Sequence, residues 1–205
     1  MTFRKGRSKY RLDIHGQESH AGSAFHEGHS AILELARVIG KLEQVTDRDR
    51  GTTLNVGRVR GGTEPNVVAG HAACDIDLRF AENPVAGEVE TMLKALQPED
   101  PGVRFALSGE MEKPCMQRTP QIVEMFERAR AINAQIDTPL EEMHSGGGSD
   151  GNFTAAAGVP TLDGLGVIGN AWHSPNEYLV ISALARREFL LRGLIRSLAA
   201  EAPAG

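Results

Sequence analysis

The 205-residue sequence predicts an α+β domain of the ferredoxin-like type, followed by an incomplete α/β segment. The first observation is strict alternation of apolar and polar side chains at residues 10–15 and again at 74–80, which is typical of strands with one buried face. The second is a helical stripe of apolar side chains between residues 28 and 45. With the elements between and after them, the predicted order over residues 8–110 is β-α-β-β-α-β, the split βαβ arrangement.

Each predicted element has its own pattern. The four strands carry inward-facing apolar side chains at Tyr10, Leu12 and Ile14; at Leu54 and Val56; at Cys74, Ile76, Leu78 and Phe80; and at Val103, Phe105 and Leu107. The first helix carries Ile32, Leu35, Ile39 and Leu42 on one stripe, and a second helix is expected over 85–96. The third strand exposes Asp75, Asp77 and Arg79 on its other face, where three charges require water or a site.

The second segment begins after Pro114. Thr119 and Pro120 predict a helix start, because threonine caps a helix and proline fits its first position. A glycine-rich turn at 145–150, a short alanine-rich helix, an apolar strand at 159–165 and a closing helix from Ser182 follow. The closing helix is expected to bury Leu191, Leu194, Ile195 and Leu198. About two strands and three helices are too few to bury both faces of a sheet, so this segment is expected to be half of an α/β domain.

Composition excludes several classes of function. Twenty-two basic and 27 acidic side chains give a net charge of -5, which argues against nucleic acid and anionic membranes as partners. No run approaches 18 apolar residues and no export signal is recognisable, so a soluble, cytoplasmic protein is expected. The two cysteines, Cys74 and Cys115, are isolated and predict ordinary core positions rather than a disulfide or a thiolate zinc site.

The histidines and paired glutamates offer few metal sites by spacing alone. His26 and His29 could share a helix face, but no third ligand is near, and a solvated helix start is the favoured reading. His71 and His144 have no motif around them and are expected to be structural or on the surface. A dinuclear hydrolase could use Glu141 and Glu142 as base and ligand, although an exposed pair is the commoner explanation.

The glycine-rich turn at residues 146–150 points to a ligand contact. Three glycines ahead of a helix resemble an anion-binding helix N-terminus, although the lysine of a phosphate loop is missing. Asp150 is equally well explained as a simple helix cap. The glycines are harder to explain structurally, because glycine costs backbone entropy unless close approach or a positive φ is needed.

Four motifs in order resemble the zinc aminoacylase and carboxypeptidase family, which contains glutamate carboxypeptidase, succinyl-diaminopimelate desuccinylase and acetylornithine deacetylase. The motifs are residues 14–22 (IHGQESHAG), 61–68 (GGTEPNVV), 75–79 (DIDLR) and 146–152 (GGGSDGN), with 173–178 (HSPNEY) after them. They span almost the whole chain. The resemblance implies a lid or dimerisation domain over 1–113 and a C-terminal segment of the catalytic domain over 114–205.

The resemblance also implies roles for single residues. His173 would be a terminal ligand of a two-zinc centre, and His20 would reach across a homodimer to stabilise an oxyanion in the partner's site. Asn66 and Arg79 would bind the substrate, Arg79 by clamping its carboxylate, and Gly148 would offer backbone to it. The implied substrates are N-acyl amino acids or peptides with a C-terminal glutamate.

The sequence departs from the family pattern in its missing ligands. Family members are about twice as long, and their remaining zinc ligands and catalytic glutamate pair precede the lid, whereas here the predicted lid begins near residue 8. Since one ligand cannot hold a dinuclear site, we expect the isolated chain to be inactive as a truncated portion of a zinc hydrolase. The alternative is a non-catalytic dimerisation or regulatory module derived from the lid.

Overall fold

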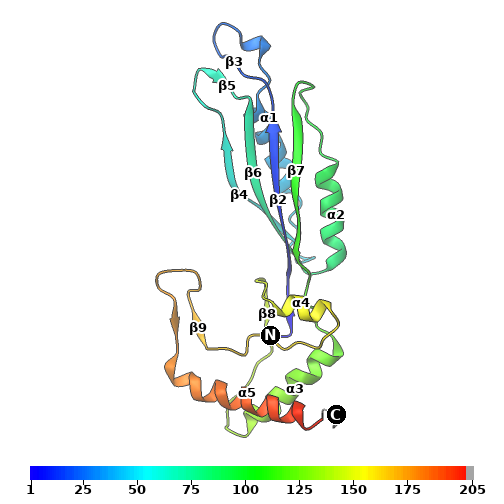
Figure 1. Cartoon of the computed structure of the whole chain (residues 1–205), viewed down its shortest axis with the longest axis vertical. Helices are drawn as coiled ribbons and strands as arrows, with labels where there is room; N and C mark the ends of the chain where they lie inside the picture. Colours follow the sequence, from blue (N-terminus) through cyan, green and yellow to red (C-terminus); the bar gives the residue numbers. More distant parts are fainter. Residues whose placement is uncertain (202–205) are drawn as a thin grey trace. The chain divides into compact units, whose positions relative to one another are not determined.

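The computed structural model describes residues 1–201, which fall into two compact units (Figure 1). The first, called the sheet unit here, comprises Lys5–Cys115 together with Gly146–Gly148. The second, called the helix unit, comprises Met1–Arg4, Met116–Ser145 and the chain from Ser149 onward. Each unit has its own cluster of buried apolar side chains.

A four-stranded antiparallel sheet in the order β4–β6–β2–β7 forms the frame of the sheet unit. Its strands are β2 (Gly6–His15), β4 (Thr53–Gly61), β6 (His71–Phe80) and β7 (Arg104–Lys113). With α1 (Ala31–Glu43) after β2 and α2 (Asn83–Lys94) after β6, the chain order is β-α-β-β-α-β. The predicted ferredoxin-like fold class is therefore confirmed.

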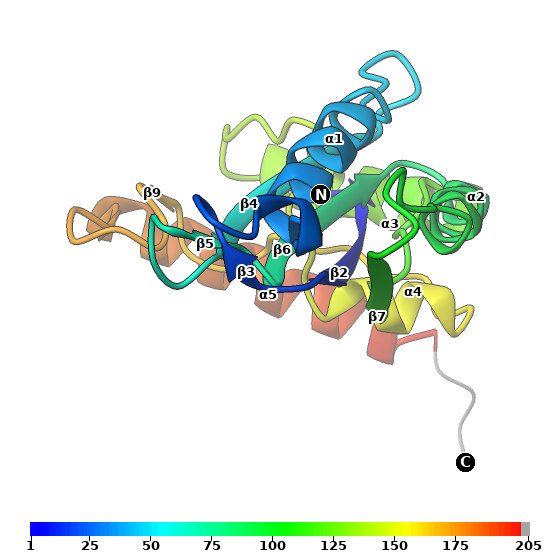
Figure 2. The ribbon, with the colours of Figure 1, turned by 90° about the horizontal axis from the view of Figure 1, so that it is seen from above.

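The two helices of the sheet unit cover the same face of the sheet (Figure 2). Helix α1 packs over β4 and β6 and is capped by Ser30, whose hydroxyl accepts from the Leu33 amide at 3.2 Å. Its buried face is centred on Leu35, Val38 and Leu42. Ile32, predicted to lie on this face, is 45% exposed, so that part of the predicted stripe is wrong.

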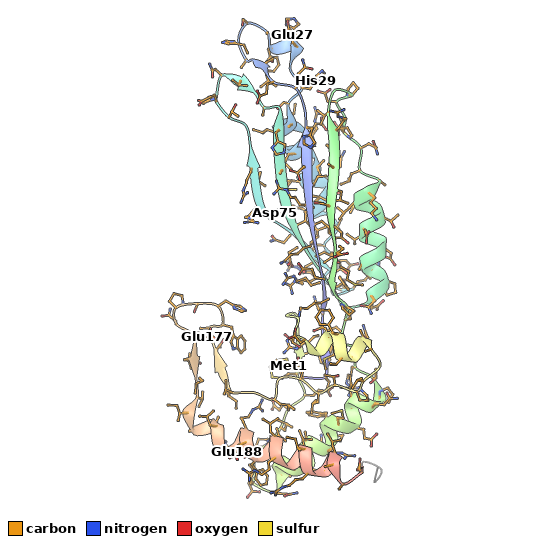
Figure 3. The ribbon with its side chains drawn as sticks, in the orientation of Figure 1. Met1, Glu27, His29, Asp75, Glu177 and Glu188 are labelled. Carbon is orange, nitrogen blue, oxygen red and sulfur yellow. The ribbon has the colours of Figure 1, made fainter. Side chains whose placement is uncertain are left out.

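Acidic and basic side chains alternate over the opposite face of the sheet, where Asp75 is labelled in Figure 3. Ion pairs cross between strands and along them: Arg7 with Glu112, Arg11 with Asp13, Arg58 with Asp75 and Arg79 with Asp77. The charges predicted for one side of residues 75–79 thus balance each other. Cys74 and Cys115 lie in the apolar core, as predicted, and burial raises the pKa of the Cys74 thiol to about 11.

A small two-stranded sheet forms one end of the sheet unit. It pairs β3 (Ser19–His20) with β5 (Val67–Val68), and the 3₁₀ turn η1 (Phe25–Glu27) follows β3. Glu27 and His29 are labelled at this end in Figure 3. This end, called the tip here, carries two of the segments in which the sequence motifs lie, residues 14–22 and 61–68.

Three α-helices and two short ladders make up the helix unit. The helices are α3 (Pro120–Ala134), α4 (Gly151–Ala156) and α5 (Leu184–Ala199), and the 3₁₀ turn η2 (Ile181–Ala183) precedes α5. In one ladder β1 (Phe3–Arg4) is parallel to β8 (His144–Ser145), and in the other β9 (Gly169–Asn170) is antiparallel to β10 (Tyr178–Leu179). Helix α3 starts as predicted, with Thr119 accepting from the Ile122 amide and Pro120 in the first turn.

Two predictions for the helix unit are wrong. Residues 159–165 form no strand, because no neighbouring segment in the described structure pairs with them. Helix α5 buries Leu190 and Leu194 against α3, whereas Leu191, Ile195 and Leu198 are exposed. Leu194 is buried as predicted, but the other three predicted residues are exposed, because the helix is apolar on two sides and periodicity alone does not choose between them. No helix among the described residues is both long and apolar enough to cross a membrane.

Candidate functional site

The tip brings His20 and Asn66 together although they are far apart in sequence. In the β3–β5 ladder His20 is paired with Val67, the residue after Asn66. Just beyond the ladder, the Ala21 amide donates to the Asn66 carbonyl at 2.9 Å. Both side chains are exposed. Two of the residues assigned to the site by resemblance therefore lie on one loop cluster with their polar groups open to a ligand.

The ring of His20 is oriented by its own loop. Its Nδ1 accepts hydrogen bonds from the backbone amides of Gly22 at 3.0 Å and Ser23 at 3.1 Å. Because both partners are donors, the neutral ring carries its proton on Nε2. The exposed edge of His20 is thus a hydrogen-bond donor. A donor held in place before a ligand arrives suits the stabilisation of a negatively charged oxygen.

Close packing behind His20 keeps this loop in shape. Gly28 lies so near β3 and β5 that a Cβ there would come within 2.3 Å of the Ser19 hydroxyl and 2.8 Å of a Val68 methyl group. Only glycine allows the η1 turn to approach the ladder so closely. The Ala24 amide also donates to the His20 carbonyl at 3.0 Å, which closes the turn between them.

Arg79 lies on β6, on the charged face of the sheet. Its guanidinium holds the Asp77 carboxylate with two bonds, Nε to Oδ1 at 2.6 Å and one Nη to Oδ2 at 3.2 Å. Arg7 of β2 adds a longer contact to the same carboxylate at 3.5 Å. In this arrangement Arg79 is an ion-pair partner within the sheet, and it would have to exchange Asp77 for a substrate carboxylate to act as a clamp.

The glycine-rich loop is exposed at Gly148 and fixed just after it. The Ser149 hydroxyl donates to the Asp163 carboxylate, and the Ser149 amide donates to the Oδ1 of the buried Asn152 at 2.8 Å. Arg4 donates from Nε to the same Asp163 carboxylate at 2.6 Å. Burial opposes ionisation of Asp163 and by itself would raise its pKa. The hydrogen bonds from the Ser149 hydroxyl and the Gly164 amide outweigh this effect and hold the pKa of Asp163 below its ordinary value.

Asp150 stands at the position expected for a cap of α4. The residue precedes α4, but its side chain makes no capping bond to the helix. Sequence reasoning missed Asp163 altogether. The signal available was a single acidic residue inside an otherwise apolar run, which implies a buried partner.

His173 lies in the loop between β9 and β10, in the helix unit. It is exposed and has a φ of 66°, an uncommon value for a residue with a side chain. No group of three or more histidine, cysteine, aspartate or glutamate side chains among residues 1–201 is arranged to hold a metal ion. The described residues alone therefore do not fit a zinc site, whether at His173 or elsewhere.

Two further histidines, His29 and His71, have structural contacts. His29 Nδ1 lies 2.7 Å from a carboxylate oxygen of Asp100, and His71 Nε2 lies 3.2 Å from Asp13. His26 is 81% exposed and does not share a metal site with His29. The solvated and structural readings of these residues are consistent with their positions.

Glu142 has a structural partner that its tandem position with Glu141 did not predict. Arg118 holds its carboxylate through Nε at 2.5 Å and an Nη at 3.1 Å, and the Thr2 hydroxyl donates to it at 2.5 Å. These bonds, with Arg118 the strongest influence, lower the pKa of Glu142 to about 2. A carboxylate held ionised in this way is a poor general base near neutral pH, since its affinity for a proton is too low.

Comparison with known proteins assigns this architecture. The model of the M20 peptidase dimerisation domain matches residues 2–101. An uncharacterised protein of Bacillus subtilis, YqjE, is 32% identical over 94% of this chain and 52% of its own length. Carboxypeptidase G2 of a Pseudomonas species is 26% identical over 92% of the chain and 46% of its length. A succinyl-diaminopimelate desuccinylase of Alkalilimnicola ehrlichii is also 26% identical, over 95% and 52%.

Solved structures agree with these relatives. The aminopeptidase PepT of Bacillus cereus superposes with a TM-score of 0.82 at 28% identity, covering 97% of this chain and 53% of that one. A tripeptidase of Staphylococcus aureus, at 23% identity, shares the fold with a TM-score of 0.81. The chain spans about half the length of the relatives it matches. Residues 2–101 are therefore an M20 peptidase dimerisation domain, and over most of its length the chain is similar to carboxypeptidase G2, succinyl-diaminopimelate desuccinylase and the aminopeptidase PepT.

Proposed function

We propose that this chain supplies the lid, over residues 1–113, and part of the catalytic domain, over 114–205, of a zinc-dependent amide hydrolase. Its substrates would be N-acyl amino acids or peptides with a C-terminal glutamate, and it would work in the cytoplasm. Support comes from the named relatives, which include a carboxypeptidase and a desuccinylase, and from the site residues at the tip.

The observation that carries the proposal is the orientation of His20. Its Nδ1 is occupied by two backbone amides, so its Nε2–H points away from the loop as a donor. When an amide carbonyl is attacked, its oxygen gains negative charge, and a preset donor stabilises that charge more than it stabilises the substrate. His20 would serve this oxygen, with Asn66 beside it binding the substrate.

The lid would form a homodimer, as the name of the matched domain suggests. The outer edge of β4 is free of a neighbouring strand in the described sheet, and Ile32 and Leu33 of α1 and Val59 of β4 are exposed. Ile32 lies over the end of β4, where its side chain approaches Gly61. Apolar side chains beside an open strand edge favour pairing with a second copy about a two-fold axis. His20 would then act in the partner's site.

The metal requirement defines what the chain lacks for catalysis. In the proposed enzyme His173 would be one ligand of two zinc ions, which would activate water. The described residues do not include the other ligands in a suitable arrangement, so we expect no hydrolysis by the chain alone. The same observation favours one alternative, a dimerisation or regulatory module without catalysis.

A chimera tests the proposal. The segment of the Bacillus subtilis relative that lies outside the matched region would be joined to this chain, supplied with zinc and assayed on N-acyl amino acids and on folyl-glutamate-like amides. We expect turnover by the chimera and none by the chain alone.

His20→Ala should lower kcat about 100- to 1,000-fold, as loss of an oxyanion donor does. His26→Ala, a matched change at the same tip, should leave kcat unchanged. An active chimera indifferent to His20→Ala would remove His20 from the mechanism, and an inactive, folded chimera would favour the non-catalytic module.

A further inference from the structure

A hollow of about 420 Å³ crosses the charged face of the sheet. It lies at the level of Tyr10 and Ile76, which pair with each other across β2 and β6. Its two ends lie at Gly57 of β4 and Gly109 of β7. This hollow is called the sheet groove here, and Asp75, labelled in Figure 3, stands in one of its walls. Its volume is within the range of pockets that hold small molecules.

The sheet groove exists because one row of the sheet has no side chains on this face. Tyr10 and Ile76 are each 3% exposed, and their side chains pack in the core beneath the helices. The ends of the row are the two glycines. The floor is therefore backbone. The walls are the charged side chains of the neighbouring residues along the inner strands, which are Lys9 and Asp77 on one side and Arg11 and Asp75 on the other.

Glycines keep both ends of the sheet groove open. Gly57 is the extra residue of a β-bulge in β4. Gly109 has a φ of 110°, and a Cβ there would lie 2.1 Å from the Lys9 carbonyl oxygen. Glycine weakens a strand, and within one it often marks a place where a ligand approaches the backbone. Two such glycines on opposite outer strands, at one level of the sheet, indicate a site built for a ligand.

The acidic groups in the walls are already occupied. Arg79 binds the Asp77 carboxylate with two hydrogen bonds, and Arg7 adds a contact at 3.5 Å. Arg58 contacts one oxygen of Asp75 with Nε and with one Nη, each at 2.7 Å. A cationic ligand would have to displace an arginine from either carboxylate, so the arrangement disfavours cations.

The basic groups, in contrast, retain donors for a ligand. An ammonium group has three N–H donors, and that of Lys9 contacts one acidic group, Glu112, at 3.2 Å. The second Nη of Arg58 has no acceptor among residues 1–201. Both side chains are more than half exposed, and they stand in opposite walls. The sheet groove therefore offers hydrogen-bond donors and positive charge to an anion.

The shape of the sheet groove restricts the ligand further. Its walls stand on residues two apart along each strand, which places them roughly 7 Å apart. The floor belongs mainly to β2 and β6, the inner strands, whose backbone groups bond to strands on both sides. Such a floor offers contact area without free hydrogen-bonding groups. It suits a flat apolar group that lies between the walls.

We propose that the sheet groove binds a small organic anion, a carboxylate with a flat, apolar body. The body lies on the floor between Gly57 and Gly109. The carboxylate accepts from the Lys9 ammonium, while Arg58 in the opposite wall adds positive charge. This inference concerns binding alone and does not depend on the proposed hydrolysis.

Solution NMR of the full chain, without added metal, tests the inference. Titration with 2-naphthoate should give saturable shifts at the backbone amides of Gly57, Ile76 and Gly109. Neutral 2-naphthamide, which has the same body without the charge, should bind at least about threefold more weakly. The 2-naphthylmethylammonium ion should give no shifts at these amides. Because charge contributes to binding, the affinity for 2-naphthoate should also fall as the salt concentration rises.

Two variants locate the ligand. Lys9→Gln should weaken 2-naphthoate binding about three- to tenfold, since one exposed charged donor is lost. Gly57→Val should weaken it at least about tenfold by filling one end of the groove. A Cβ at Gly57 would meet only the end of the Asn55 side chain, at 3.3 Å, so the strand should accept valine. Lys41→Gln, on α1 over the other face of the sheet, is the matched control and should leave binding unchanged.

Four results would overturn the inference. The first is 2-naphthoate shifts that are absent or confined to the helix unit. The second is equal affinity for 2-naphthoate and 2-naphthamide, which would leave the charge without a role. The third is binding of the ammonium probe at the groove amides. The fourth is wild-type affinity for 2-naphthoate in Lys9→Gln or in a folded Gly57→Val, which would place the ligand elsewhere.

Discussion

Arg79 and Asp77, two residues apart on the same face of β6, form a bidentate ion pair with Nε to Oδ1 at 2.6 Å. Their side chains are 25% and 34% exposed. A substrate carboxylate that bound to Arg79 would have to displace the Asp77 carboxylate from the guanidinium. Any role for Arg79 in substrate binding therefore includes the cost of releasing Asp77, whereas a structural role does not.

Arg79→Ala should change the free energy of unfolding by less than about 1 kcal/mol, because a partly exposed ion pair contributes little. Leu78→Ala, next along the strand and fully buried, should cost about 2 to 5 kcal/mol by leaving a cavity. Urea denaturation of the two variants measures both effects. Strong destabilisation by Arg79→Ala, comparable to that of Leu78→Ala, would show that the charge network holds the sheet together.

Glu142 should make the helix unit sensitive to acid. Hydrogen bonds from Arg118 and Thr2 lower the pKa of Glu142 to about 2, below its ordinary value of 4.5. A carboxyl whose pKa is lower when folded stabilises the fold above its unfolded pKa, and that stabilisation fades as the pH falls from about 4.5 toward 2. Glu142→Gln should therefore be less stable than wild type at pH 7, and the difference should shrink below pH 4.

Thermal unfolding followed between pH 7 and pH 3 checks this prediction. Glu141→Gln is the matched control, since Glu141 is exposed and should give no such trend. A constant difference between Glu142→Gln and wild type across the range would contradict the assigned cause of the pKa shift.

The sequence predicted the sheet unit well because its elements are locally consistent. Alternation at residues 10–15 and 74–80 specifies which face of each strand is buried, and a shift by one residue would expose the whole apolar set. The cap at Ser30 was not predicted, and the predicted α1 stripe was right at Leu35 and Leu42 but wrong at Ile32. Its buried face includes Glu34, a charged residue that a search for apolar periodicity passes over.

The helix unit was predicted less well for a physical reason. Residues 159–165 have the composition of a buried strand, but a strand also needs a partner, and composition does not report whether one is present. On α5 both Leu190 and Leu191 fit an apolar stripe, and the contact with α3 decides between them. The site depends on long-range pairing in the same way: spacing does not bring His20 beside Asn66, and the roles given to both came from the family resemblance.

Glu34 provides a third prediction because its carboxylate is buried in the sheet unit. It accepts from the backbone amides of Glu99 at 3.0 Å and Asp100 at 3.3 Å, and it pairs with Arg37. Glu34→Ala should destabilise the protein by about 1.5 to 3 kcal/mol, since two amides lose a charged acceptor. Glu43→Ala, at the exposed end of the same helix, should change stability by less than about 0.5 kcal/mol.

Hydrogen exchange distinguishes the cause of this loss. If Glu34 fixes the loop through its amides, Glu34→Ala should speed exchange at Glu99 and Asp100 by more than it speeds exchange in the core strands. Uniform acceleration throughout the sheet unit would instead assign the effect to packing of α1.

The last prediction concerns the edge through which the sheet unit would dimerise. The sheet has two outer strands, β4 and β7, and both are open in the described structure. The β4 edge has the apolar side chains of Ile32 and Val59 beside it, whereas Met111 on β7 lies between Glu110 and Glu112. Charged side chains along an edge discourage strand pairing, and apolar ones favour it.

We therefore expect a dimer of the full chain at micromolar concentration, joined through the β4 edge. Ile32→Glu should convert it to a monomer by burying an unpaired charge at the interface, while Met111→Glu should not. Sedimentation velocity measures all three proteins. A wild-type monomer would count against action of His20 in the partner's site, and a dimer that dissociates only with Met111→Glu would move the interface to β7.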